Sequence, residues 1–184
     1  MSVSLFERPA PAPPHRGRVY IETYGCQMNV SDSELILGCL ADEGYLHADR
    51  PDEADVVLLN TCAIREHAEQ RVLGRLGELK GRVRPGTLFG VVGCMAQRLG
   101  PKLLDEAGHV SLVVGPDGYR ALPALLEQAR QGGRAVRVDF DLEEHYEGIR
   151  PVRNGSVRAW IPVQRGCDYR CTYCIVPVTR GPER

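Results

Sequence analysis

The sequence lacks any stretch of roughly 18 apolar residues, so no segment is long enough to cross a membrane as a helix. Its first residues also lack the apolar core of a secretory signal. They are rich in proline, and we expect residues 1–17 to form a disordered tail. Without a signal the expected location is cytoplasmic. In that compartment seven cysteines are more typical of metal ligands or catalysts than of disulfides.

The chain also has little net charge, −1 over 184 residues. The charge is nevertheless unevenly spread. Residues 149–184 contain seven arginines against Asp168 and Glu183, whereas the remainder is acidic. A basic C-terminal segment is compatible with a phosphate-bearing partner and equally with a solvated arginine-rich surface.

Short apolar runs alternate with helical patterns along most of the chain. The strands are expected at residues 18–24, 54–60, 87–92, 111–114 and 135–140. Helices are expected behind a capping box at residues 31–34 and over 95–107, with Pro101 starting its second part. Two more helices are indicated by apolar residues at intervals of three and four. The first is marked by Ile64, Ala68, Val72, Leu76 and Leu79, and the second by Leu122, Leu125, Leu126 and Ala129. This alternation predicts the α/β class, an open parallel sheet flanked by helices.

The pattern changes after residue 141. We expect an α/β domain over residues 18–141 and a polar linker over 142–155, with a tight turn at Asn154-Gly155. Residues 156–164 read as a strand, so residues 156–184 are expected to begin a second domain that the chain does not complete.

Cys167, Cys171 and Cys174 have the spacing C-x3-C-x2-C. Three thiolates on one short loop can hold three irons of a 4Fe–4S cluster and leave the fourth iron open for a substrate or cofactor. A structural zinc site needs a fourth Cys or His nearby, and the last histidine is His145, some twenty residues upstream. The loop therefore favours an iron–sulfur cluster over zinc or free thiols.

Cys26, Cys62 and Cys94 are far apart in sequence, but each directly follows an expected strand. In an open parallel sheet the loops at the carboxyl ends share one edge, where ligands bind. If the three strands are neighbours, three thiols meet there, with Gly25 and Gly93 allowing tight turns and helix N-termini favouring thiolates. The alternative is three small buried apolar side chains at strand ends.

The remaining cysteine and the histidines give weaker signals. Cys39 lies on the apolar side of a helix and is expected to pack in the core. His67 is near Cys62, but a solvated helix histidine is the preferred interpretation. The loop after the first strand contains no G-x-G-x-x-G pattern, which argues against a nucleotide-binding module.

Four segments together resemble a known family, the radical-SAM methylthiotransferases. They are residues 24–34 (YGCQMNVSDSE), 60–66 (NTCAIRE), 93–98 (GCMAQR) and 165–180 (RGCDYRCTYCIVPVTR). Within that family the match is to the MiaB type, which modifies tRNA. Relatives that modify a ribosomal protein usually carry Pro-Lys after the first motif cysteine, and those acting on threonylcarbamoyl-adenosine carry Lys-Val. This chain has Gln27-Met28.

The resemblance implies a chemistry. Cys167, Cys171 and Cys174 would bind the radical-SAM cluster, whose open iron would chelate S-adenosylmethionine, with Tyr173 near the adenine. Electrons from a donor would cleave S-adenosylmethionine to a 5′-deoxyadenosyl radical. The radical would abstract hydrogen from C2 of N6-isopentenyladenosine 37 of tRNA. Cys26, Cys62 and Cys94 would hold a second 4Fe–4S cluster that carries the sulfur, and a second S-adenosylmethionine would supply the methyl group.

The resemblance also implies missing parts. Family members continue into most of a radical-SAM partial β/α barrel and a small RNA-binding domain. The chain is therefore expected to be the N-terminal part of such an enzyme and not to turn over by itself. Two rival hypotheses remain: a methylthiotransferase that acts on threonylcarbamoyl-adenosine or a ribosomal protein, and a non-enzymatic metal- or nucleotide-binding module.

Overall fold

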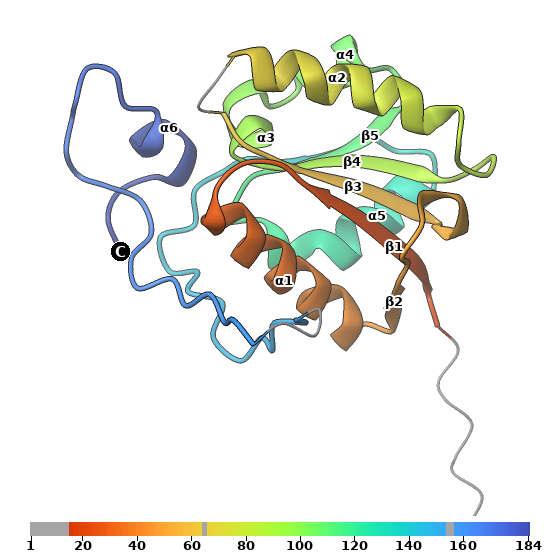
Figure 1. Ribbon diagram of the computed structural model, residues 1–184, viewed down its shortest axis with the longest axis horizontal. Coiled ribbons are helices and arrows are strands. Elements are labelled where there is room, and N and C mark those ends of the chain that lie inside the picture. The colour runs from red at the N-terminus through yellow and green to blue at the C-terminus, as the bar shows by residue number, and fades with distance from the viewer. Residues whose placement is uncertain (1–14, 64–65, 154–156) are drawn as a thin grey trace, which may run out of the picture.

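The computed structural model describes residues 15–63, 66–153 and 157–184. Its described residues form one six-stranded sheet in the order β2-β1-β3-β4-β5-β6, and every adjacent pair is parallel. The strands are β1 (Gly17–Thr23), β2 (Tyr45–His47), β3 (Val56–Thr61), β4 (Leu88–Gly93), β5 (Val110–Val114) and β6 (Ala135–Arg137). The predicted open parallel sheet is confirmed (Figure 1).

Helices cover both faces of this sheet. They are α1 (Gln27–Asp42), α2 (Glu66–Lys80), α3 (Cys94–Leu99), α4 (Lys102–Glu106), α5 (Leu122–Arg130) and α6 (Val176–Arg180), with single 3-10 turns η1 (Pro51–Glu53) and η2 (Tyr119–Ala121). In Figure 1, α2, α3 and α4 lie above the sheet, and α1 and α5 lie below it. None of the helices in the described part of the chain is long and apolar enough to cross a membrane.

The core explains why the central strands are continuous apolar runs. All six residues of β3 are buried, because successive side chains point into opposite helical layers. Val57 and Leu59 pack with α2 and α3, whereas Val56 and Leu58 pack with α1 and α5. Cys39 is buried in the second of these layers, which confirms its predicted place in the core.

The strand order reverses between β1 and β3. From β1 the chain runs through α1 to β2 on one side, and from β3 it runs through α2 to β4 on the other. Ligands of open α/β sheets bind outside the carboxyl ends of the strands at such a switch point. Cys26 and Cys62 follow the two strands that flank it.

The start of α1 differs from the sequence prediction. The expected capping box at residues 31–34 is wrong, because α1 begins at Gln27 and Cys26 occupies the N-cap position. Asp32 and Ser33 are buried one turn further in, where they bond to other parts of the fold. The expected break before the second part of the 95–107 helix is confirmed, since α3 ends at Leu99 and α4 follows Pro101.

Both ends of the sheet also differ from expectation. Gly17 belongs to β1 rather than to the tail, and the tail residues 1–14 lie outside the described residues. The short strand β2 was not predicted, because three residues carry little periodicity. Strand β6 ends at Arg137 instead of residue 140. Beyond it the backbone bonds to side chains instead: the Val138 carbonyl accepts from Gln97, and the Asp141 amide donates to Asp117.

The segment expected as a linker packs against α1. Residues 142–153 contain no helix or strand, but the Val152 amide donates to the Glu34 carbonyl at 2.9 Å. A Cβ at Gly38 would lie 2.3 Å from the Arg150 carbonyl oxygen, so this glycine permits the crossing. The expected turn at Asn154-Gly155 lies outside the described residues.

The strand expected over residues 156–164 is absent from its described part, residues 157–164. Val157, Ile161 and Val163 are exposed there, and the segment pairs with none of the six described strands. An extended segment without a partner forms no ladder. Residues 157–184 thus contain α6 and irregular backbone, and a partial barrel beginning at residue 156 stays a prediction.

Candidate metal centre

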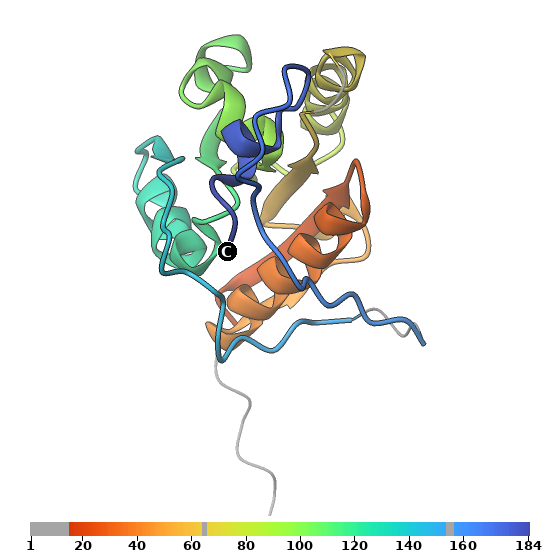
Figure 2. The ribbon, with the colours of Figure 1, turned by 90° about the vertical axis from the view of Figure 1, so that its left-hand side faces the viewer.

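Three cysteines meet at the carboxyl edge of the sheet. Cys26 caps α1 after β1, Cys62 follows β3, and Cys94 is the first residue of α3 after β4. These three strands are adjacent. All three cysteines line one cavity of about 200 Å³, which the segment from Gln164 to Arg180 closes on its other side. Figure 2 looks onto this edge, with α6 in front of the strand ends.

Two glycines allow this approach. Gly25 has a φ of +125°, and a Cβ there would lie 2.6 Å from the Cβ of Cys62. Gly93 has a φ of +90°, and a Cβ there would lie 2.5 Å from the Asn60 side-chain oxygen. Both positions therefore require glycine for conformation and for space, as the sequence predicted.

A buried amide network holds the Cys26 loop to β3. Asn29 Nδ2 donates to Asn60 Oδ1 at 3.1 Å, and Asn60 Nδ2 donates to the Asn29 carbonyl at 2.7 Å. Asn60 Nδ2 also donates to Ser33 Oγ at 2.9 Å, and that hydroxyl bonds to Thr23. Both asparagines are fully buried. The sequence placed them in motifs without revealing that they bond to each other.

A buried arginine reaches the third cysteine. Arg180 Nε donates to Cys94 Sγ at 3.1 Å. Its other two nitrogens donate to the Asp32 carboxylate: Nη2 donates to Oδ2 at 2.6 Å, and Nη1 donates to Oδ1 at 3.2 Å. The hydroxyl of Tyr119 donates to the same carboxylate at 3.1 Å. The side chains of Arg180 and Asp32 are only 4% and 8% exposed, so this pair lies in the interior.

The site changes the acidity of its members. Burial raises the pKa of the Cys94 thiol, and the neighbouring Arg180 charge opposes that rise. The expectation that a helix N-terminus favours a thiolate is therefore outweighed by burial at this cysteine. Burial would lower the pKa of Arg180, but Asp32 raises it well above its ordinary value.

A second buried carboxylate fastens the same C-terminal segment. Asp117, whose side chain is 2% exposed, pairs with Arg165 at 3.3 Å and with Arg184. The backbones of Arg165 and Arg184 bond to each other in both directions, at 2.8 and 2.9 Å. The loop that contains Cys167, Cys171 and Cys174 is thus closed at its base and held to the sheet domain.

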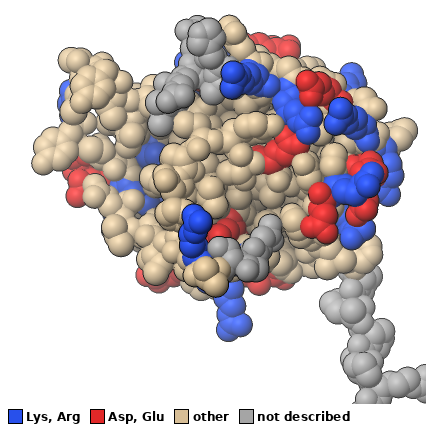
Figure 3. Space-filling view, viewed as in Figure 1, with Lys and Arg blue, Asp and Glu red and all other residues tan. Residues whose placement is uncertain are grey.

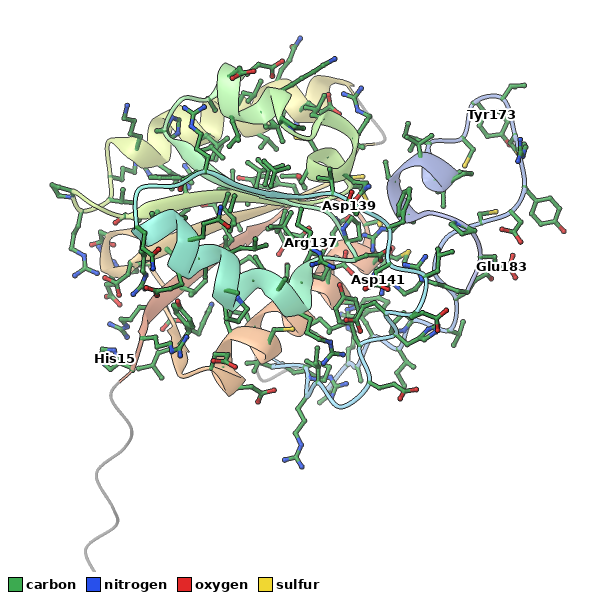
Figure 4. All side chains as sticks on the ribbon, turned by 180° about the vertical axis from the view of Figure 1, so that it is seen from behind. His15, Arg137, Asp139, Asp141, Tyr173 and Glu183 are labelled. Atoms are coloured by element: carbon green, nitrogen blue, oxygen red, sulfur yellow. The ribbon has the colours of Figure 1, made fainter. Side chains whose placement is uncertain are left out.

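The three loop cysteines are not gathered into a site. As at the edge site, they form no metal-binding group in the described part of the chain: Cys171 is exposed, Cys167 and Cys174 are half-buried, and the Cys167 amide donates to the Gly181 carbonyl. Tyr173 is 90% exposed and lies at the outer end of the loop, far from the sheet (Figure 4). Their predicted roles as cluster ligands and cofactor contact stay predictions. The side chain of His67 lies outside the described residues.

The donor chemistry of the edge site fits an iron–sulfur cluster. All seven cysteines are free of disulfides. Sulfur ligands select soft metals and iron–sulfur clusters. Within residues 15–63, 66–153 and 157–184, no three His, Cys, Asp or Glu side chains are already gathered at metal-binding distance. Three free thiols around one cavity nevertheless supply the residue types that such a cluster needs.

Comparison with known proteins finds a matching family and several similar proteins. A model of the family described as "Uncharacterized protein family UPF0004" matches residues 18–115. The chain is also similar to proteins named tRNA-2-methylthio-N(6)-dimethylallyladenosine synthase. The identity is 50% for the protein of Chloroherpeton thalassium, over 92% of this chain and 38% of that protein. For Chlorobium phaeobacteroides it is 48%, over 91% and 38%, and for Porphyromonas gingivalis 45%, over 91% and 37%.

Fold and sequence thus define the class of this protein: it is an α/β sheet domain with three cysteines at the carboxyl edge of the sheet. The chain belongs to the UPF0004 family, whose model covers the sheet from β1 to β5. It resembles the N-terminal part of the synthases named above, and it spans a little over a third of the length of these curated relatives.

Proposed function

We propose that this chain is the N-terminal part of a tRNA methylthiotransferase. The reaction is the methylthiolation of C2 of N6-isopentenyladenosine 37, the nucleoside that the names of the relatives call dimethylallyladenosine. The observation that carries the proposal is the meeting of Cys26, Cys62 and Cys94 around one cavity. The identity of 45–50% to proteins with that name supports it.

The proposed cofactors are two 4Fe–4S clusters and S-adenosylmethionine. Cys26, Cys62 and Cys94 would hold one cluster, and Cys167, Cys171 and Cys174 the other. Tyr173 would contact the adenine of S-adenosylmethionine. When bound, these groups supply the electron transfer, the radical and the sulfur that an unactivated aromatic C–H bond requires. Other partners would be an electron donor and tRNA, in a cytoplasmic setting.

The protein's own residues have a clear task in this proposal. The amide network fixes the Cys26 loop, and the glycines let the Cys62 and Cys94 loops approach. Residues from Gln164 to Arg180 line the cavity on the side opposite the cysteines, one of which, Cys94, is buried. We propose an α/β domain over residues 18–141, a linker over 142–155, and the beginning of a radical-SAM domain over 156–184.

Nucleoside analysis tests the substrate. In a strain from which the gene is deleted, digested tRNA should lack the 2-methylthio derivative and accumulate isopentenyladenosine. The complete gene should restore the product, and a copy with Cys26→Ala should not. The 2-methylthio product persisting at its normal level in the deletion strain would remove the assignment. Loss of a modified threonylcarbamoyl-adenosine or ribosomal protein instead would select the rival substrates, against which Gln27-Met28 argues.

A further inference from the structure

Arg180 divides its hydrogen-bond donors between a carboxylate and a sulfur. Two of its nitrogens contact the two oxygens of Asp32, and the third contacts Cys94 Sγ. A guanidinium is always protonated, and its donors lie in one plane. Because two of these donors bond to Asp32, the direction in which the Nε–H points is fixed as well. The side chain of Arg180 is only 4% exposed, so it makes these contacts largely shielded from bulk solvent.

Asp32 is itself held from other elements. It projects from α1 and accepts a hydrogen bond from Tyr119, which is fully buried on η2. The Tyr119 amide in turn donates to the Tyr146 hydroxyl, in the segment that follows β6. The carboxylate is therefore held by contacts within the sheet domain as well as by Arg180, and through it the sheet domain helps to set the position of Nε.

We infer that Arg180 is a positioning residue for the Cys94 sulfur, and that its hydrogen bond raises the reduction potential of a cluster bound at Cys26, Cys62 and Cys94. This inference rests on the proposed function, because it requires a cluster at these cysteines. Hydrogen bonds to ligand sulfurs and nearby positive charge stabilise the reduced cluster, which carries one more negative charge. The contact also links the segment of the second cysteine loop to the first site.

The chain contains a matched pair that lacks the sulfur contact. Asp117 and Arg184 form an ion pair that is equally buried, with side chains 2% and 7% exposed. It joins the same C-terminal segment to the same domain, and Arg184 has no hydrogen bond to a cysteine among those found in the described residues. Asp117 also pairs with Arg165 at 3.3 Å, so replacing Asp117 and both arginines controls for the structural effect of removing a buried ion pair.

The test uses the 184-residue chain with Cys167→Ala, Cys171→Ala and Cys174→Ala, so that one cluster site remains. Asp32→Asn with Arg180→Met removes the first pair without leaving one charge buried alone, and Asp117→Asn with Arg165→Met and Arg184→Met does the same for the control pair and its second arginine. Each protein is reconstituted anaerobically with iron and sulfide. Iron content, far-ultraviolet circular dichroism and the midpoint potential are measured, the last by redox titration followed by electron paramagnetic resonance.

We expect the Asp32/Arg180 variant to shift to lower potential. At the midpoint potential of the parent, its ratio of reduced to oxidised cluster should fall about tenfold, which is 59 mV for a one-electron couple. The control variant should stay near the parent. Failure of the Asp32/Arg180 variant alone to retain iron, with an unchanged dichroism spectrum, would also support the positioning role. Arg180→Lys, which keeps the charge with a different donor geometry, should lie between parent and variant.

Other results separate the two proposals. Equal shifts, equal iron losses or no shift in the Asp32/Arg180 variant and the control variant would overturn the role of Arg180, because the effect would then belong to any buried ion pair. A parent protein that takes up no iron at Cys26, Cys62 and Cys94 would instead contradict the proposed function.

Discussion

Arg180 forms a two-point ion pair with Asp32, although 148 positions separate them in the sequence. The pair joins the last turn of α6 to the buried side of α1, and its remaining donor reaches Cys94. One arginine thereby connects the C-terminal segment, the first helix and the candidate metal centre.

Removing Arg180 should strongly destabilise the fold. Arg180→Ala leaves the Asp32 carboxylate buried without a cation, and breaking one partner of a buried pair costs about 3–5 kcal/mol. Arg184→Ala should cost less, because Arg165 still faces Asp117 at 3.3 Å. Urea unfolding followed by circular dichroism measures both. Equal losses for the two variants would contradict the assigned difference.

A methyl group at Gly25 should disrupt the cysteine edge. Gly25→Ala places a Cβ against the Cβ of Cys62 and strains the backbone, so both stability and iron uptake should fall. Gly44→Ala is the matched control. Its φ is +84°, but no atom lies within 4 Å of the added Cβ, so it should lose on the order of 1–2 kcal/mol and keep its iron. Normal iron uptake by Gly25→Ala would contradict the close approach of the two loops.

Stability should fall in acid partly through Glu22. Burial would raise the pKa of Glu22, but hydrogen bonds from Arg75, Tyr24 and Tyr20 lower it below its ordinary value of 4.5. A carboxyl whose folded pKa is lowered stabilises the fold fully above the unfolded value, and this contribution disappears as pH falls through the folded pKa. Between about pH 5 and about pH 3, the parent should therefore lose more unfolding free energy than Glu22→Gln. Parallel pH profiles would contradict this role.

The thiol of Cys39 in the core should react slowly. Burial raises the pKa of the Cys39 thiol to about 11, so at pH 8 roughly one molecule in a thousand carries a thiolate there. Cys171 is exposed. In the metal-free protein, iodoacetamide should modify Cys171 well before Cys39, as peptide mass spectrometry would reveal. Equal rates would place Cys39 outside the core.

The sheet and the convergence of three cysteines at its edge could be predicted, because both depend on patterns of neighbouring residues in the sequence. Residues 56–59 are a continuous apolar run because β3 is buried on both faces, and each of the three cysteines follows one of three neighbouring strands. The start of α1 could not be predicted in this way. Cys26 is an unusual N-cap residue, and residues 31–34 imitate a capping box one turn too late.

The Arg180 contacts could not be predicted, because pairing over 148 residues leaves no local period. A signal existed in Asp32, an acidic residue on the buried side of a helix, which needs a cation or donors. The sequence offered seven arginines in the C-terminal segment and no means of choosing among them. The charged surface gives no help either, since acidic and basic side chains intermingle on the face in Figure 3, away from the C-terminal loop.

Iron and sulfide analysis after anaerobic reconstitution tests the central claim most directly. The account predicts about eight irons and eight sulfides per chain, falling to about four when Cys26, Cys62 and Cys94 are all replaced by Ala. Each of these substitutions made singly should remove most of the same share, because the three thiols serve one cluster, and Cys39→Ala should leave the content unchanged. Stoichiometric zinc with negligible iron, or an iron content that ignores Cys26, Cys62 and Cys94, would contradict the account.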